Sequence, residues 1–141
     1  MRESLQIDGI DVLIEGEGTH TVLMLHGWPD TPALWDSTVA ALQDGYRCAR
    51  LALPGYDLSR PPRPMPLVQI TAFFRKVVDA VSPDAPVTLL LHDWGCLFGY
   101  EFAARHTERV ARVIGVDIGD TSSAAYRQGL ALKEKWMIAY Y

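Results

Sequence analysis

The sequence has few of the features that would link it to a disulfide scaffold, a membrane or a nucleic acid. Its two cysteines, Cys48 and Cys96, form no metal-binding cluster and cannot define a disulfide framework. No apolar run is long enough to span a membrane, and the N-terminus lacks the apolar core of a signal peptide. The net charge of −4 comes without a basic stripe. We therefore expect a cytoplasmic protein with no nucleic-acid or membrane partner, no metal and no other cofactor.

Length and composition indicate a single globular domain. A chain of 141 residues can bury a hydrophobic core, and it is too short for two domains. Hydrophobic residues make up 49% of the chain and charged residues 21%, which is ordinary for a globular protein. No internal repeat or low-complexity tract suggests a different architecture.

Apolar runs and helical periodicities alternate along the chain. Residues 5–7 and 10–15 read as a hairpin joined at Asp8-Gly9. Beyond it, runs typical of buried strands alternate with helical patterns, one of which begins at Thr31-Pro32 and is expected to bury Leu34 and Trp35. The expected strands are 21–25, 46–53, 87–91 and 110–116, and the other expected helices are 70–81 and 96–105. This order predicts a three-layer α/β/α fold, with helices on both faces of a mostly parallel sheet.

One strand end has the sequence of a catalytic turn. The apolar run 87–91 stops abruptly at His92-Asp93-Trp94-Gly95, and a helical pattern follows. Asp93 then lies on a sharp strand-to-helix turn near the N–H groups that begin the helix, and Gly95 permits close packing there. The arrangement is typical of a nucleophile elbow with Asp in place of Ser. An aspartate before a helix is equally a favoured N-cap with no chemistry.

A second motif follows another strand of the same sheet. His26-Gly27-Trp28-Pro29 comes directly after the buried strand 21–25. Ligand sites in open parallel sheets lie at the carboxyl ends of the strands. Because both motifs fall at such ends, we expect them to meet at one edge of the sheet.

Together with the turn Leu53-Pro54-Gly55-Tyr56, these motifs resemble the α/β-hydrolase fold family over nearly the whole chain. Within that family they are similar to the branch with an aspartate nucleophile, the epoxide hydrolases and haloalkane dehalogenases. The resemblance implies that Asp93 is the nucleophile and that the backbone N–H groups of Trp28 and Trp94 form the oxyanion hole. It also implies that Trp94 lines the pocket for a small apolar substrate, although a tryptophan at a strand end is often a core residue.

The residue after His26-Gly27 separates the two activities of this branch. Many dehalogenases carry an asparagine there, whose side chain helps to bind the halide, whereas this chain carries Trp28. The resemblance therefore favours epoxide hydrolysis, with haloalkane dehalogenation as the alternative.

The mechanism of this branch also needs a histidine base and an acid that orients it. The family supplies that histidine near its C-terminus, and none of the four histidines fits the role: His20, His26, His92 and His106. Asp117, which ends the strand 110–116, is the candidate acid, and its structural alternative is a carboxylate that accepts backbone N–H groups. Cys96 is a weaker candidate nucleophile than Asp93, because it lies inside the helix and not at the turn.

We expect residues 1–120 to form the N-terminal part of the hydrolase core and residues 121–141 to begin a helical lid. No glycine, proline or capping pattern stops the last helix, so the chain looks truncated inside its lid. The chain alone is then predicted not to complete a turnover. An incomplete sheet would expose an edge strand, so we expect a complementary C-terminal segment or a homo-oligomer. The alternative function is a non-catalytic fragment that serves as a binding or assembly module.

Overall fold

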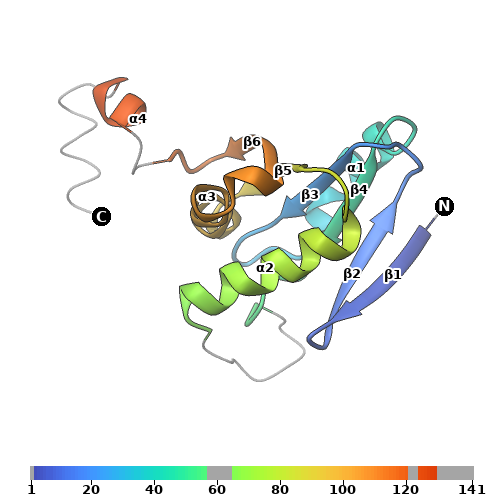
Figure 1. The fold of residues 1–141 in the computed structure, drawn as a ribbon. Coiled ribbons are helices and arrows are strands. Elements are labelled where there is room, and N and C mark those ends of the chain that lie inside the picture. Colours follow the sequence, from blue (N-terminus) through green and yellow to red (C-terminus); the bar gives the residue numbers. More distant parts are fainter. Residues whose placement is uncertain (1, 57–64, 121–123, 130–141) are drawn as a thin grey trace.

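The computed structural model describes residues 2–56, 65–120 and 124–129, and at its centre lies a six-stranded sheet (Figure 1). The strands follow the order β1-β2-β4-β3-β5-β6 across the sheet. Their bounds are β1 (Arg2–Ile7), β2 (Ile10–Glu15), β3 (Thr21–Leu25), β4 (Arg47–Leu51), β5 (Val87–His92) and β6 (Val110–Val116). The strands β4, β3, β5 and β6 are parallel, whereas β1 and β2 form an antiparallel hairpin that pairs with β4. The predicted mostly parallel sheet is confirmed.

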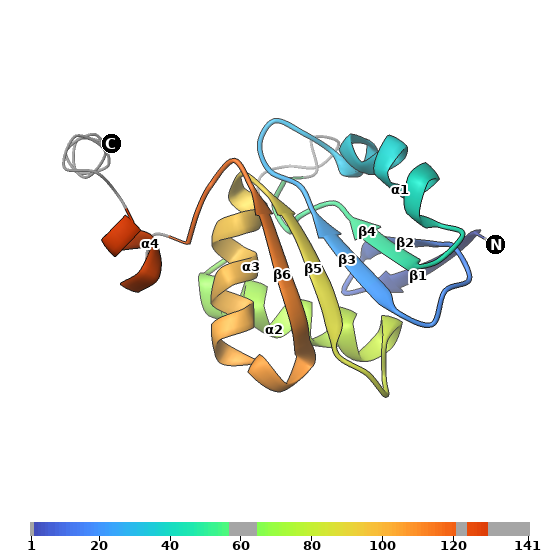
Figure 2. The same cartoon turned by 90° about the horizontal axis from the view of Figure 1, so that it is seen from above.

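Helices cover both faces of this sheet (Figure 2). The helices α2 (Leu67–Val81) and α3 (Trp94–Arg105) lie on one face. The short 3-10 helix η1 (Pro32–Trp35) and α1 (Asp36–Leu42) lie on the other. A second 3-10 turn, η2 (Thr107–Arg109), leads into β6, and α4 (Ala124–Gly129) follows β6 in the chain. The three-layer α/β/α architecture predicted from the alternating pattern is therefore present.

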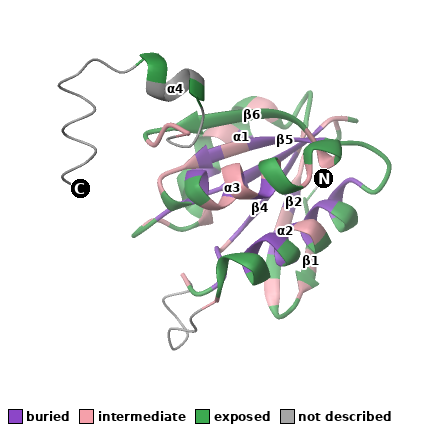
Figure 3. Ribbon diagram, turned by 60° about the vertical axis from the view of Figure 1, so that its left-hand side comes forward, coloured by how far each residue is buried: buried purple, intermediate pink, exposed green. Residues whose placement is uncertain are grey.

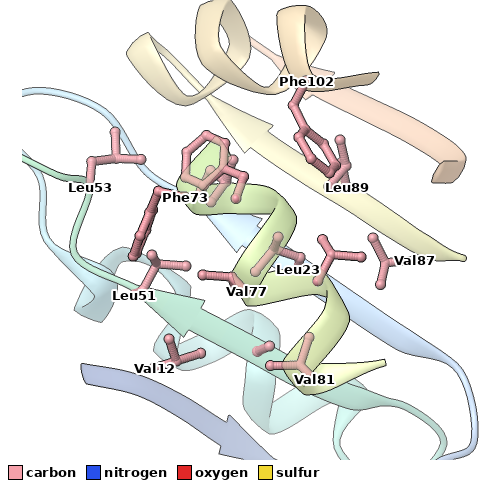
Figure 4. Packing of buried hydrophobic residues seen from close by; sticks show 14 of the residues in the cluster. Val12, Leu23, Leu51, Leu53, Phe73, Val77, Val81, Val87, Leu89 and Phe102 are labelled. Atoms are coloured by element: carbon pink, nitrogen blue, oxygen red, sulfur yellow. The ribbon is translucent and has the colours of Figure 1, made fainter. Parts of the chain in front are cut away.

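The larger core lies between the sheet and the pair α2 and α3 (Figure 4). The helix α2 buries apolar residues spaced three and four apart, as its sequence periodicity predicts. Phe74 of α2 meets Phe102 of α3 edge to face, with the ring centroids 6.2 Å apart. This core fixes α3 against the sheet and thereby fixes the turn from which α3 begins.

A smaller core lies on the opposite face, where Trp35 and Val39 pack over residues of β3 and β4. The expectation that Leu34 is buried there was wrong, because its side chain is exposed. The chain enters this helix as a 3-10 turn, capped by the Thr31 hydroxyl, which accepts a hydrogen bond from the Ala33 N–H. Side chains repeat every three residues in such a turn, so Trp35 faces the sheet and Leu34 does not.

The strand β6 is an exposed edge of the sheet (Figure 3). Among the described strands it pairs only with β5, and residues 111–116 are all exposed. Two grooves flank it, one of about 460 Å³ against β5 and β3 and one of about 340 Å³ against α3. Apart from α4, the expected lid segment 121–141 lies outside the described residues. In the part of the chain that the structure covers, no helix is long and apolar enough to cross a membrane.

Candidate active site

Asp93 occupies the turn between β5 and α3 with an unusual backbone conformation. Its φ of 50° and ψ of −122° lie outside the regions that residues with a side chain prefer, a strain of about 1–3 kcal/mol. Its backbone carbonyl accepts a hydrogen bond from the Cys96 N–H at 2.8 Å, which begins the helix. Its side chain makes no capping hydrogen bond to the first turn of α3. The structure therefore does not support the N-cap interpretation of this carboxylate.

Two glycines allow the backbone to approach this turn closely. A Cβ added to Gly95 would lie 2.3 Å from the carbonyl oxygen of Leu25, so α3 packs directly on the end of β3. A Cβ added to Gly27 would lie 2.2 Å from Oδ2 of Asp93. Only glycine leaves room for the Asp93 carboxylate beside the loop that follows β3.

The backbone N–H of Trp28 donates a hydrogen bond to Oδ2 of Asp93, with 2.8 Å between the nitrogen and the oxygen. The two motifs predicted to meet at one edge of the sheet therefore do so. The peptide bond between Trp28 and Pro29 is cis. Trp94, the second predicted oxyanion-hole residue, is the first residue of α3 and directly follows Asp93 in the chain.

Aromatic rings form a wall beside the carboxylate. The ring of Tyr56 lies between Trp28 and Phe98, with centroid separations of 6.4 and 6.1 Å, and Trp94 stacks on Phe98 at 6.0 Å. Both tryptophan side chains are exposed, so neither is a core residue. The pKa of the Tyr56 phenol is raised mainly by burial and, to a smaller extent, by the negative charge of Asp93. Sequence reasoning did not assign Tyr56 to the site, although it belongs to the turn after β4 that carried the resemblance.

His26 is buried and holds the end of β3 in place. Its Nδ1 lies 2.8 Å from the carbonyl oxygen of Gly27, and its Nε2 accepts a hydrogen bond from the Leu53 N–H at 3.2 Å. Since Nε2 is the acceptor, Nδ1 carries the proton and the ring is neutral. Burial lowers the pKa of His26 and outweighs the opposing hydrogen bond to Gly27. Both ring nitrogens of His26 are thus engaged by backbone groups.

The side chain of His92 lies next to Asp30. Its Nδ1 is 3.6 Å from Oδ2 of Asp30, too long for a hydrogen bond but close enough for an ion pair when the ring is protonated. Asp30 was not singled out from the sequence. Its place one residue beyond Pro29, at the same sheet edge as Asp93, is the signal that could have identified it.

Asp117 follows β6 and is exposed, with a positive φ of 81°. Within the described residues, neither a hydrogen bond nor an ion pair joins its carboxylate to another group. The alternative role, a carboxylate that accepts backbone N–H groups, is therefore not seen there, and the role as acid stays a prediction. Cys96 is buried, and its thiol contacts the Val116 carbonyl at 3.4 Å. Over the same residues, no cluster of potential metal ligands is found.

Comparison with known proteins gives several similar proteins, and two of them are described here. EphD of Mycobacterium tuberculosis, named a probable oxidoreductase, is 33% identical over 117 residues, which are 77% of this chain and 20% of that protein. Epoxide hydrolase 1 of Caenorhabditis elegans is 26% identical over 126 residues, which are 85% of this chain and 31% of that protein. The chain thus spans about a fifth to a third of the length of these relatives.

The fold is also similar to that of solved epoxide hydrolase structures. The epoxide hydrolase VrEH1 of Vigna radiata aligns with 99% of this chain and 46% of its own, with a TM-score of 0.75 and 22% identity. At this identity the likeness establishes the fold. The family described as the alpha/beta hydrolase fold matches residues 20–141, which include both motifs and the turn between them. On this match and this architecture, the chain belongs to the α/β hydrolase fold family.

Proposed function

We propose that this chain carries the nucleophile and the oxyanion hole of an epoxide hydrolase that works through a covalent ester on Asp93. The observation that carries the proposal is the hydrogen bond of 2.8 Å from the Trp28 N–H to Oδ2 of Asp93, at a strained turn where the carboxylate caps nothing. Strained residues held by their surroundings cluster at active sites. A backbone N–H aimed at a carboxylate oxygen is the arrangement that ester chemistry on that carboxylate requires.

The hydrogen bond assigns different roles to the two oxygens of Asp93. Oδ2 is held by the Trp28 N–H, so Oδ1 attacks a carbon of the epoxide ring. The new bond joins Oδ1 to that carbon and the ring C–O bond at that carbon breaks. The ring oxygen stays bonded to the neighbouring carbon as an alkoxide and takes a proton from water. Oδ2 becomes the carbonyl oxygen of the ester and already lies against an oxyanion-hole donor.

Hydrolysis of the ester restores the carboxylate. Water attacks the ester carbonyl carbon and gives a proton to a base, and negative charge develops on Oδ2. The Trp28 N–H, and in our proposal the Trp94 N–H, stabilise that charge. The bond between the carbonyl carbon and Oδ1 then breaks, and the leaving alkoxide takes the proton from the base and departs as the diol. The new carboxyl group of Asp93 gives its proton to solvent, which restores the carboxylate.

We propose that none of the four histidines of the chain serves as the base for this second step. His26 is locked by two backbone groups, and His92 lies against Asp30. His20 contacts the Thr88 hydroxyl at 2.8 Å, and His106 packs against the ring of Phe102 with centroids 4.9 Å apart. We therefore propose that this chain alone reacts with at most one equivalent of epoxide, because the ester persists.

The rings of Trp28, Tyr56, Phe98 and Trp94 support a small apolar substrate. The name of the C. elegans relative supports the choice of an epoxide. Haloalkane dehalogenation is the second candidate, because Asp93 could displace a halide from an alkyl carbon by the same attack. The absence of a side-chain amide at Trp28 favours the epoxide.

Incubation with an epoxide and a matched bromoalkane at equal concentration distinguishes these candidates. An epoxide leaves its oxygen on the protein as a 2-hydroxyalkyl ester, whereas a bromoalkane leaves an alkyl group, so intact-mass measurement separates the two adducts. We expect one 2-hydroxyalkyl adduct per chain. A faster alkyl adduct would reverse the ranking, and more than one equivalent of diol would contradict the absence of a base.

We further propose that the exposed β6 edge takes a complementary polypeptide segment, continuous with this chain or separate, that adds a strand to the sheet. The grooves on both faces of β6 support this, since a following strand and its helix would fill them. Light scattering on the purified chain and on Val113→Lys tests it. We expect a monomer in both, whereas a dimer that Val113→Lys dissociates would show that a second copy covers this edge.

A further inference from the structure

Arg50 is a buried charge with three partners. It lies on β4 and is only 5% exposed. Its Nη2 is 2.8 Å from Oε2 of Glu15 on β2, and its Nη1 donates to the carboxylate of Asp36, the first residue of α1. Nη1 also donates to the carbonyl oxygen of Pro32, at 3.0 Å. A buried charge is tolerated only when it is paired in this way, so these partners are arranged around Arg50.

The bond to Pro32 is not needed to neutralise the charge, because two carboxylates already do so. Pro32 begins η1 and ends the loop that starts at His26 and carries Trp28. At the other end of this loop, Nε2 of His26 accepts a hydrogen bond from the Leu53 N–H. Residues of β4 and of the turn after it therefore hold both ends of the loop, with only residues 27–31 between them.

We propose that Arg50 is a positioning residue, which holds this loop so that the Trp28 N–H stays aimed at Oδ2 of Asp93. The expected effect of Arg50 on ester formation rests on the function proposed above. Its effect on geometry can be measured independently. Burial lowers the pKa of Arg50, but the neighbouring carboxylates outweigh this effect and raise it, so the guanidinium stays charged.

The chain offers a control that separates this role from a general contribution to stability. Arg50→Met removes the bond to Pro32 together with both ion pairs. Glu15→Gln removes one ion pair of the same buried group and leaves the bond to Pro32 in place. If Arg50 served stability alone, each variant would act on the site only as far as it lowers the free energy of unfolding.

The test uses the ¹⁵N-labelled chain and two readouts, the Trp28 amide in solution NMR and the rate of ester formation with a reactive epoxide. In Arg50→Met we expect the Trp28 amide signal to shift and its hydrogen exchange to become at least about tenfold faster. Ester formation should slow by about 10- to 100-fold, below the loss expected for complete removal of an oxyanion donor. Glu15→Gln should leave both readouts close to wild type.

An unchanged Trp28 amide in folded Arg50→Met would overturn the proposal. If that variant does not fold, Arg50→Lys decides, because lysine keeps the charge but lacks the planar fork that reaches Pro32 and the carboxylates together. An unchanged amide in Arg50→Lys would overturn the proposal in that case. Failure of the wild-type chain to form any ester would refute the proposed function, while the amide would still report on Arg50.

Discussion

Gly27→Ala should disable the site without removing any functional group. The added Cβ would lie 2.2 Å from Oδ2 of Asp93 and 2.5 Å from its Cβ, both far inside van der Waals contact. Either the carboxylate or the loop must move by more than 1 Å, and the hydrogen bond of 2.8 Å from the Trp28 N–H is then lost. Loss of one oxyanion-hole donor typically slows catalysis by about 10²- to 10³-fold, or roughly 2.7–4 kcal/mol. Overpacking should also lower the free energy of unfolding by about 1–3 kcal/mol.

The assay is the rate at which the chain gains one 2-hydroxyalkyl group, followed by intact-mass spectrometry under excess epoxide. Gly45→Ala is the matched control, since a Cβ there meets no atom within 4 Å. We expect Gly45→Ala to react at the wild-type rate and Gly27→Ala to react about 10²- to 10³-fold more slowly. A Gly27→Ala chain that is folded and reacts as fast as wild type would refute the geometric argument for this site.

Three further predictions concern stability, measured as the free energy of unfolding in urea. Gly95→Ala should lower it by about 1–3 kcal/mol, because the new Cβ meets the Leu25 carbonyl at 2.3 Å; wild-type stability would contradict this packing. Phe74→Ala should lower it by about 3–5 kcal/mol, and a loss below 1 kcal/mol would mean that α2 is not packed as described. Burial lowers the pKa of His26, so below its ordinary value of 6.5 the unfolded chain binds the proton first and stability declines as the pH falls. His26→Asn should therefore lose less stability than wild type between pH 7.5 and 5.5, and equal losses would argue against a buried neutral ring.

Local patterns were enough to predict the elements of this fold. Runs of β-branched and leucine residues indicated the central strands, and spacings of three and four indicated α2, because burial imposes these periods on the sequence. The burial of Leu34 was predicted wrongly because this prediction assumed the period of an α-helix. Its spacing suits an α-helix, but the chain forms a 3-10 turn at that point, and the choice between the two depends on the cap at Thr31 and the packing of Trp35.

The site was predictable only as far as the sheet topology brings strand ends together. Asp93 and Trp28 were predicted to meet because each follows a parallel strand. The sequence could not show whether the Asp93 side chain caps α3. The answer depends on the backbone conformation of Asp93, and the conformation found here is one that few residues with a side chain adopt. The contribution of Arg50 was also invisible, because its partners Glu15 and Asp36 lie on other elements.

Peptide mapping of the covalent adduct tests directly whether Asp93 is the nucleophile. Wild type and Asp93→Asn are incubated with a reactive epoxide, digested, and the modified residue is located by tandem mass spectrometry. Asparagine is close in shape to aspartate, so Asp93→Asn should stay folded while it loses the attacking carboxylate. We expect one adduct, on Asp93, in wild type and none in the variant. An adduct on another residue, or one that persists in Asp93→Asn, would mean that Asp93 is not the nucleophile.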